Sequence, residues 1–417
     1  MKNNIFLHEN GRFSWANACV GNNGNPGIWT YAEGFIKSAE LIINSTIRES
    51  ELQVSIDELV YPACFNLRHA IELAIKAATQ ALSYIASIKG ATIQDDIEKS
   101  HDISYIWANF KAESLSLDSR FASIISLMDD IIHSFSETDP TGQTFRYPTS
   151  SYSHKHLTEI AIINFFKLKE ITEATKKSIK ELKTLSKRLT EEYNLGTFTK
   201  SLSRDDIQAI SKKLPPINSW KNPEFGSTKE KLKADFKISG RELSKAINII
   251  KRHHQFSQNI GVTIPLNESH NHHVGRFIYW AVTYYSATKT SQPGNGRFLH
   301  NFQKFIEETQ KSAKLEKLAW KDFSHLATPK NQAVITSLYY FGSELDFSEN
   351  YVNDLHAYCK EFEIHGMRSI ENSFQHILRK TDAIPSIINS LSFLGHKKLS
   401  TRLTKTYNLK KHFGSIK

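Results

Sequence analysis

Residues 57–76 read DELVYPACFNLRHAIELAIK, the most regular helical pattern in the chain. Apolar side chains recur there at spacings of three and four residues, which is the repeat of one face of an α-helix. The pattern continues on both sides and predicts a long helix from about Ile56 to Ile88. Two adjacent polar residues interrupt it. On a helical wheel Arg68 lies at the edge of the apolar stripe, one turn before Glu72, whereas His69 lies on the opposite face.

The opposite face of this helix is also unusual, because His69 lies one turn from both Phe65 and Leu73. A histidine between two exposed apolar side chains would be odd, so we expect a further helix or a second subunit to cover this face. Two interpretations remain open. His69 is either a buried, hydrogen-bonded histidine beside an Arg68–Glu72 pair, or one member of a catalytic group.

Most of the remaining chain shows the same helical periodicity, and β-type alternation is scarce, so the predicted fold class is all-α. Ser100 is the predicted N-cap of one helix, and an Ile-Ser-Gly turn separates two helices within residues 229–254. Further helices are predicted over residues 31–48, 118–135, 154–193, 274–290, 297–319, 329–345 and 348–362.

The predicted domains follow from breaks in this pattern. Residues 1–30 are rich in turn-forming residues and form an N-terminal loop segment, and the YNLGT break comes at residues 193–197. We therefore expect a helical bundle over residues 31–195 and a basic helical domain over residues 196–417.

Composition limits the classes of function. The chain of 417 residues carries a formal net charge of +10, which attracts polyanions such as nucleic acid. Its three cysteines are far apart, which argues against a disulfide framework or a thiolate zinc site and is typical of a reducing cytoplasm. We see no leader peptide and no apolar stretch as long as a membrane span. A cytoplasmic protein that does not act at a membrane is the expectation.

Four segments in order resemble bacterial proteins that carry a domain of the HEPN superfamily. They are TYAEGFIKSAELI, DELVYPACFNLRHAIELAIK, HDISYIW and DPTGQTFRYP, and the resemblance covers residues 30–190. It implies a helical bundle that often dimerises. It also implies a metal-independent ribonuclease of toxin–antitoxin, CRISPR-associated or abortive-infection systems.

The catalytic motif that the resemblance implies is an arginine followed four to six residues later by a histidine, and this chain departs from it. The nearest equivalent is Arg146, followed by His154 and His156 at the expected start of a helix, with Pro148 between them. Catalysis would need another group, for which the candidates are Arg68, His69, His101 and Arg146. There an imidazole would move the proton of a ribose hydroxyl while a guanidinium stabilises phosphate charge. An alternative for Arg146 is a pair with a core carboxylate such as Glu72.

Two basic segments are candidates for nucleic-acid binding. Residues 229–254 resemble a helix-turn-helix, and an ordinary helical pair is the alternative. Basic residues also follow Asp382, interleaved with Phe393, Tyr407 and Phe413, and a solvated helix is the alternative there. The candidate nucleic-acid-binding residues are Arg241, Lys245, Lys251, Arg252, Lys397, Lys398 and Arg402.

The histidines near residues 253–254 and 270–273 have no spacing that completes a zinc site, so we predict no metal and no cofactor. The run QPGNGRF at residues 292–298 follows no strand and is not a phosphate-binding loop.

The basic charge predicts a protein that binds nucleic acid. The HEPN resemblance implies a homodimer that binds or cleaves RNA in prokaryotic defence or a toxin-type system, with a partner protein encoded nearby. A non-catalytic interaction or sensor module and a DNA-binding regulator using residues 229–254 are the alternatives.

Overall fold

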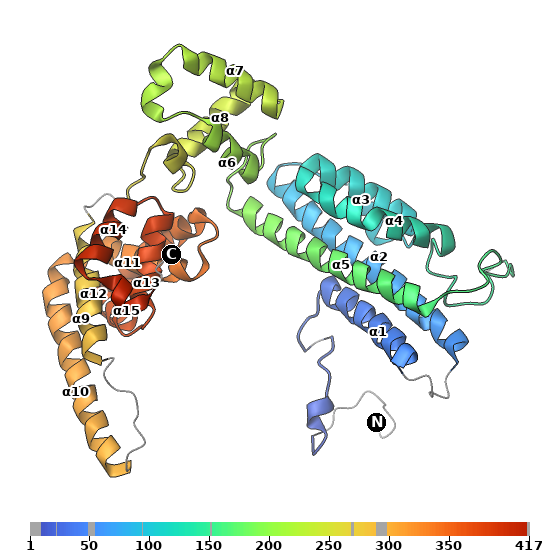
Figure 1. Ribbon diagram of the computed structural model, residues 1–417, viewed down its shortest axis with the longest axis horizontal. Coiled ribbons are helices and arrows are strands. Elements are labelled where there is room, and N and C mark those ends of the chain that lie inside the picture. The colour runs from blue at the N-terminus through green and yellow to red at the C-terminus, as the bar shows by residue number, and fades with distance from the viewer. Residues whose placement is uncertain are drawn as a thin grey trace. The chain divides into compact units, whose positions relative to one another are not determined.

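The computed structural model describes residues 10–21, 23–48, 55–93, 95–150, 152–267, 271–288 and 298–414. Within these ranges the regular secondary structure is helical, and the β-type pairing is one isolated bridge between Thr149 and Lys155. The predicted all-α class is confirmed. The chain divides into two compact units, Met1–Asn194 and Leu195–Lys417 (Figure 1). No described helix has both the length and the apolar character needed to cross a membrane.

The first unit is a bundle built on α2. Its α-helices are α1 (Ile28–Arg48), α2 (Ile56–Ile88), α3 (Ile103–Leu117), α4 (Ala122–Thr138) and α5 (Phe165–Asn194). Short 3₁₀ turns span Ser14–Ala16, Asp95–Glu98 and Ser119–Phe121. Helix α2 packs against α1, α3 and α5, as Figure 1 shows. The predicted bounds of α2 are confirmed, because its apolar repeat is continuous and the Ser55 hydroxyl caps its first turn by accepting from the Asp57 N–H.

Two helix starts in this unit differ from the prediction. The N-cap of α3 is Asp102 and not Ser100, since the Asp102 carboxylate accepts from the N–H groups of Ser104 and Tyr105 at 2.9 and 3.1 Å. Helix α4 begins at Ala122 and not at residue 118, because the Asp118 carboxylate caps a separate 3₁₀ turn.

The predicted helix start near His154 was wrong, because α5 begins at Phe165. Ser153 and Leu157 have φ values of 61° and 56°, a left-handed conformation that no right-handed helix contains. Asn164 then caps α5 by accepting from the N–H groups of Phe166 and Lys167 at 2.9 and 3.2 Å. His154 and His156 therefore lie in a non-helical connection and not at the start of a bundle helix.

The second unit begins with three short helices, α6 (Arg204–Lys213), α7 (Glu224–Phe236) and α8 (Gly240–Arg252), which share one apolar core. Helices α7 and α8 confirm the predicted pair. Lys237 ends α7 in the left-handed conformation, and the Ser239 hydroxyl caps α8. The 3₁₀ turns Ile217–Lys221 and Ser257–Ile260 flank this group.

In the described part of this unit, the helices around the larger core are α9 (His272–Thr288), α10 (Phe298–Phe323), α11 (Pro329–Glu344), α12 (Ser348–Leu378), α13 (Ala383–Phe393), α14 (Lys397–Thr406) and α15 (Leu409–Phe413). A 3₁₀ turn spans Ser324–Leu326. Helix α12 continues past the predicted residue 362, although Gly366 interrupts it with a φ of 67°. Helices α11 and α13 touch through their backbones, since a Cβ on Gly342 would overlap the backbone of Ser386.

Candidate functional site

The Arg68 guanidinium is at the centre of a buried polar cluster in the first unit, with 1% of the residue exposed. Its Nη1 donates to the Glu72 carboxylate one turn along α2. Its Nε donates to the carbonyl of Asp139 at 3.2 Å, and its Nη2 donates to the carbonyls of His101 and Pro140 at 2.6 and 2.8 Å. Arg68 therefore ties α2 to the segments that precede α3 and follow α4.

The Glu72 carboxylate collects the other polar groups of this cluster. It accepts from Lys76 Nζ at 2.8 Å and from His101 Nδ1 at 2.9 Å, and His69 Nδ1 lies 3.9 Å away. Burial by itself would raise the pKa of Glu72. The surrounding His69, Lys76, Arg68 and His101 outweigh burial and hold that pKa well below its usual range. Glu72 is therefore an anion that orients its neighbours and not a proton donor.

Helix α1 covers the face of α2 that carries His69. The imidazole ring stacks on Phe65 at a centroid distance of 5.5 Å and meets the edge of the Phe35 ring at 4.5 Å. The side chain keeps 26% of its surface exposed. The expected covering element is thus a helix of the same chain.

Arg146 is exposed and takes no part in a pair with Glu72, so that alternative is wrong. Its Nε donates to the carbonyl of Gly142 at 2.7 Å, and its guanidinium lies over the Phe65 ring at 5.4 Å. Gly142 also packs against Arg68, because a Cβ there would lie 3.1 Å from Arg68 Nη1. The four candidate catalytic residues are therefore neighbours in one cluster.

The four side chains differ in what they offer a substrate. Arg68 is buried and committed to four hydrogen bonds, so it has little to offer a phosphate. The His101 side chain is 69% exposed. Glu72 only accepts hydrogen bonds, so His101 Nδ1 carries the hydrogen of this contact, and in the neutral form of the ring the lone pair is on Nε2. A carboxylate that holds an imidazole in this tautomer is an arrangement suited to a general base.

The predicted nucleic-acid-binding residues of α8 are all exposed. Lys245 pairs with Glu242 at 2.8 Å, and Lys251 lies over the Trp220 ring at 5.0 Å. Arg241 and Arg252 have no carboxylate within 4 Å among the residues whose positions are described. Two of the four cations are thus available to an anion without breaking a contact.

Helices α14 and α15 carry what we name the C-terminal basic surface. Its members are the exposed side chains Lys397, Lys398, Arg402, Lys405, Lys410 and Lys411. Lys398, Arg402 and Lys405 are spaced i, i+4 and i+7, which places them on one face of α14. Leu399 and Leu403 are buried on the other side. No carboxylate comes within 4 Å of any of these cations in the described part of the chain.

The aromatic residues near this surface pack inward. Tyr407 lies 6.4 Å from the Tyr279 ring, Phe413 lies 4.6 Å from the Tyr285 ring, and Phe393 lies 5.5 Å from Phe341. All three are half-buried against the core of the second unit, so of these interleaved basic and aromatic residues only the basic ones are exposed. The surface offers charge and not a stacking platform.

A second buried cluster, which no sequence pattern predicts, lies in the second unit. Arg204 Nε donates to Glu349 Oε1 at 2.8 Å, and its guanidinium lies between the rings of Phe256 and Phe347 at 4.9 and 4.8 Å. His253 Nε2 lies 2.8 Å from the same Glu349 oxygen. Arg204 precedes Glu349 by 145 residues, so no local pattern joins this pair.

The described histidines of the two histidine-rich segments are mostly buried. His253, His254 and His273 are buried, and His270 lies outside the described residues, as does most of the QPGNGRF run. Among the described side chains no group of three or more histidine, cysteine, aspartate or glutamate residues is placed to hold a metal ion.

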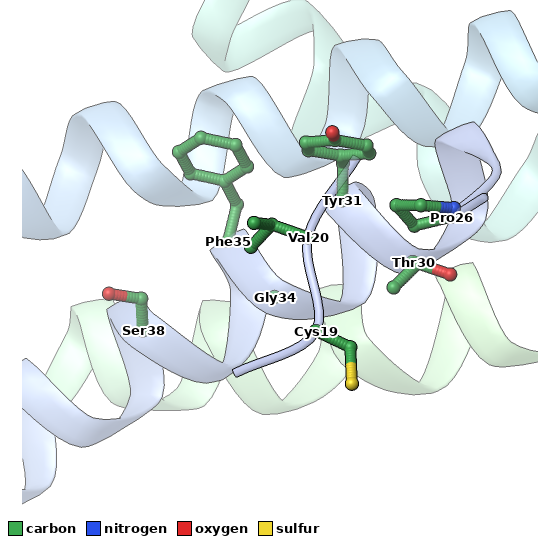
Figure 2. Close-up of a pocket in the computed structure, with 8 residues that line it drawn as sticks. All are labelled: Cys19, Val20, Pro26, Thr30, Tyr31, Gly34, Phe35 and Ser38. Atoms are coloured by element: carbon green, nitrogen blue, oxygen red, sulfur yellow. The ribbon is translucent and has the colours of Figure 1, made fainter. Parts of the chain in front are cut away.

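A cavity of about 390 Å³ lies between the N-terminal segment and α1 (Figure 2). Figure 2 shows the rings of Tyr31 and Phe35 on one side of the segment and the Cys19 sulfur directed to the other. Asn23 donates to that sulfur at 3.4 Å. The lining offers no group of charges or paired catalytic side chains.

Comparison with protein-family models, with curated proteins and with solved structures found no match to the chain. The HEPN resemblance therefore stays a prediction.

Proposed function

We propose that this protein binds nucleic acid through the C-terminal basic surface. The observation that carries the proposal is the row of Lys398, Arg402 and Lys405 on α14, exposed and without carboxylate partners in the described structure. A cation without a carboxylate partner in the protein can pair with a phosphate without first breaking an ion pair. Each such contact increases the binding affinity, because it releases counterions condensed on the strand. Arg241 and Arg252 of α8 offer additional free charges on the same unit.

RNA is the nucleic acid that we favour, because it is the substrate class implied by the HEPN resemblance of residues 30–190. On the same basis we propose a role in prokaryotic defence or a toxin-type system. The absence of exposed aromatic side chains on the basic surface predicts contacts to the strand backbone with little sequence preference.

The experiment is retention of a labelled single-stranded RNA, with DNA of the same sequence beside it. The triple variant Lys398→Ala, Arg402→Ala and Lys405→Ala should lose retention. The control is Lys177→Ala, Lys180→Ala and Arg188→Ala, which removes the same charge from exposed positions of α5. Equal retention of RNA by both variants would refute nucleic-acid binding by this surface. If the wild type retains neither RNA nor DNA, the non-catalytic interaction or sensor module is the remaining alternative.

A second candidate function is RNA cleavage, favoured by the Glu72–His101 contact of 2.9 Å with an exposed ring. His101 Nε2 would act as the base on a ribose hydroxyl, and Arg146 is the nearby exposed cation. Cleavage in the presence of EDTA that is lost in His101→Gln, with retention of RNA unchanged, supports this role. Intact RNA after incubation with the wild type would refute it.

A further inference from the structure

Helices α6, α7 and α8 of the second unit form a group with one apolar core of their own (Figure 1). Helix α8 follows α7 after a turn of residues 237–239 and packs against both α6 and α7. Two helices joined by a short turn and supported by a third are the arrangement of helix-turn-helix domains, whose last helix enters the major groove of DNA. Helix α8 has the position of that recognition helix.

One face of α8 is polar along its full length and lies opposite the face that packs into the core. The buried residues of the helix are Leu243, Ala246, Ile247 and Ile250. Residues spaced i, i+3, i+4, i+7 and i+11 follow one side of a helix. With that spacing, the exposed residues on the other side are Arg241, Ser244, Lys245, Asn248 and Arg252. We name them the α8 polar face.

The α8 polar face is open to a partner molecule. Arg241 and Arg252 have no carboxylate within 4 Å among the described residues, and the Asn248 amide makes no hydrogen bond with them. Lys245 pairs with Glu242 at 2.8 Å, and the Lys245 side chain is 49% exposed. Exposed pairs of this kind add little stability, so a phosphate or a base can replace Glu242 at small cost.

The side chains of the α8 polar face are of the kinds that recognise base edges in DNA. Arginine and lysine donate to guanine, asparagine pairs with adenine, and serine can contact either base. The row of Lys398, Arg402 and Lys405 on α14 contains cations alone, which suits contacts to a strand backbone. The two surfaces therefore differ in chemistry, since only the α8 polar face mixes cations with an amide and a hydroxyl.

The shape of α8 favours a DNA duplex over RNA. Its 13 residues make a helix about 20 Å long. The major groove of B-DNA is about 12 Å wide and admits an α-helix, whereas the major groove of an RNA duplex is too narrow to be read by side chains.

The charge of the three-helix group also suits a polyanion. Residues 204–252 contain 12 lysines and arginines against six aspartates and glutamates. Lys237 is exposed in the turn before α8, and Arg252 is exposed at the end of α8. Cations at both ends of the helix are placed for the phosphates on either side of a groove that the middle of the helix occupies.

We propose that α8 enters the major groove of duplex DNA, where Arg241, Lys245 and Asn248 contact base edges while Lys237 and Arg252 contact phosphates. This function goes beyond RNA binding by the C-terminal basic surface, because it uses another surface and needs a double strand.

Binding of a labelled DNA duplex of mixed sequence, followed by fluorescence anisotropy of the full chain, tests the surface. The variant Arg241→Ala, Lys245→Ala and Arg252→Ala should bind the duplex about tenfold more weakly or worse. The α5 control variant lacks the same number of cations and should bind like the wild type. All the replaced side chains are exposed, and circular dichroism checks that the α8 variant keeps its helix content.

Selection from a pool of duplexes with a randomised centre tests the reading of bases. The wild type should enrich one common sequence. Asn248→Ala should lose the preference at one base pair, which is a change of about tenfold between the right and the wrong base, and should keep the salt dependence of the wild type. A loss of charge alone would change the salt dependence instead.

Three results would each overturn the proposal: no duplex binding by the wild type at low salt, equal duplex affinity of the wild type and the α8 variant, or no enriched sequence. A fourth is a loss of duplex binding in the α14 triple variant as large as in the α8 variant, because the duplex would then lie on α14. Loss of RNA retention in the α14 variant with duplex binding intact supports both proposals, so the two fail separately.

Discussion

Replacing Arg68 with methionine should loosen the first unit at its centre. Methionine keeps the length of the side chain but removes four donated hydrogen bonds, three of them to carbonyls of His101, Asp139 and Pro140. Glu72 would keep Lys76 and His101 as partners, but the three carbonyls would lose the Arg68 donor. Removing one member of a buried ion pair costs about 3–5 kcal/mol, and we expect a loss in that range.

Hydrogen exchange read by mass spectrometry measures this loss in the full chain, because it reports the opening free energy of each helix separately. Peptides from α2 and from residues 139–144 should exchange faster in Arg68→Met, while those from α11 should not change. The matched control is Lys111→Met, which breaks the half-exposed pair with Asp129 and should cost less than about 1 kcal/mol. A cost for Arg68→Met no larger than that of the control would refute the structural role of Arg68.

Two further changes test the second unit. His254 has a pKa of about 4 in the folded protein against 6.5 when exposed, so the unfolded chain binds more protons between these values. The contribution of neutral His254 to the folding free energy is therefore complete above pH 6.5, and about 3 kcal/mol of it is lost as the pH falls to 4. Thermal unfolding of His254→Gln at several pH values should show a smaller loss of stability in acid than the wild type. The same pH dependence in both proteins would contradict this role of His254. Gly342→Ala should destabilise the α11–α13 contact by about 1–3 kcal/mol in urea unfolding because its Cβ overlaps Ser386. The control is Gly34→Ala, because a Cβ at this helical position meets no other atom, and it should leave the stability unchanged or increase it. If Gly342→Ala is as stable as Gly34→Ala, then α11 and α13 can move apart without a loss of stability.

Helix bounds could be predicted from the sequence where a single apolar repeat continues through a long segment. Helix α2 was predicted with its observed bounds because its apolar residues keep one period over its whole length. The depth of Arg68 was not predictable in the same way. Its burial depends on carbonyls from residues 33 to 72 positions away, which a helical wheel does not contain.

The wrong start of α5 has a related cause. Residues 154–164 have enough apolar side chains to suit a helix, but two left-handed backbone positions and the Asn164 cap decide against it. In the second unit the spacing of basic residues on α14 was visible in the sequence, whereas the inward packing of Tyr407 and Phe413 depends on α9. The Arg204–Glu349–His253 cluster joins residues that only the folded chain brings together.

The salt dependence of RNA affinity tests the central claim most directly. Each phosphate contact on a single strand adds about 0.7 to the slope of log affinity against log salt concentration. We expect the wild-type slope to fall in magnitude by about 2 in the variant that lacks Lys398, Arg402 and Lys405, and to stay unchanged in the α5 control variant. Equal slopes for all three proteins, or no RNA binding by the wild type at low salt, would contradict nucleic-acid binding by the C-terminal basic surface.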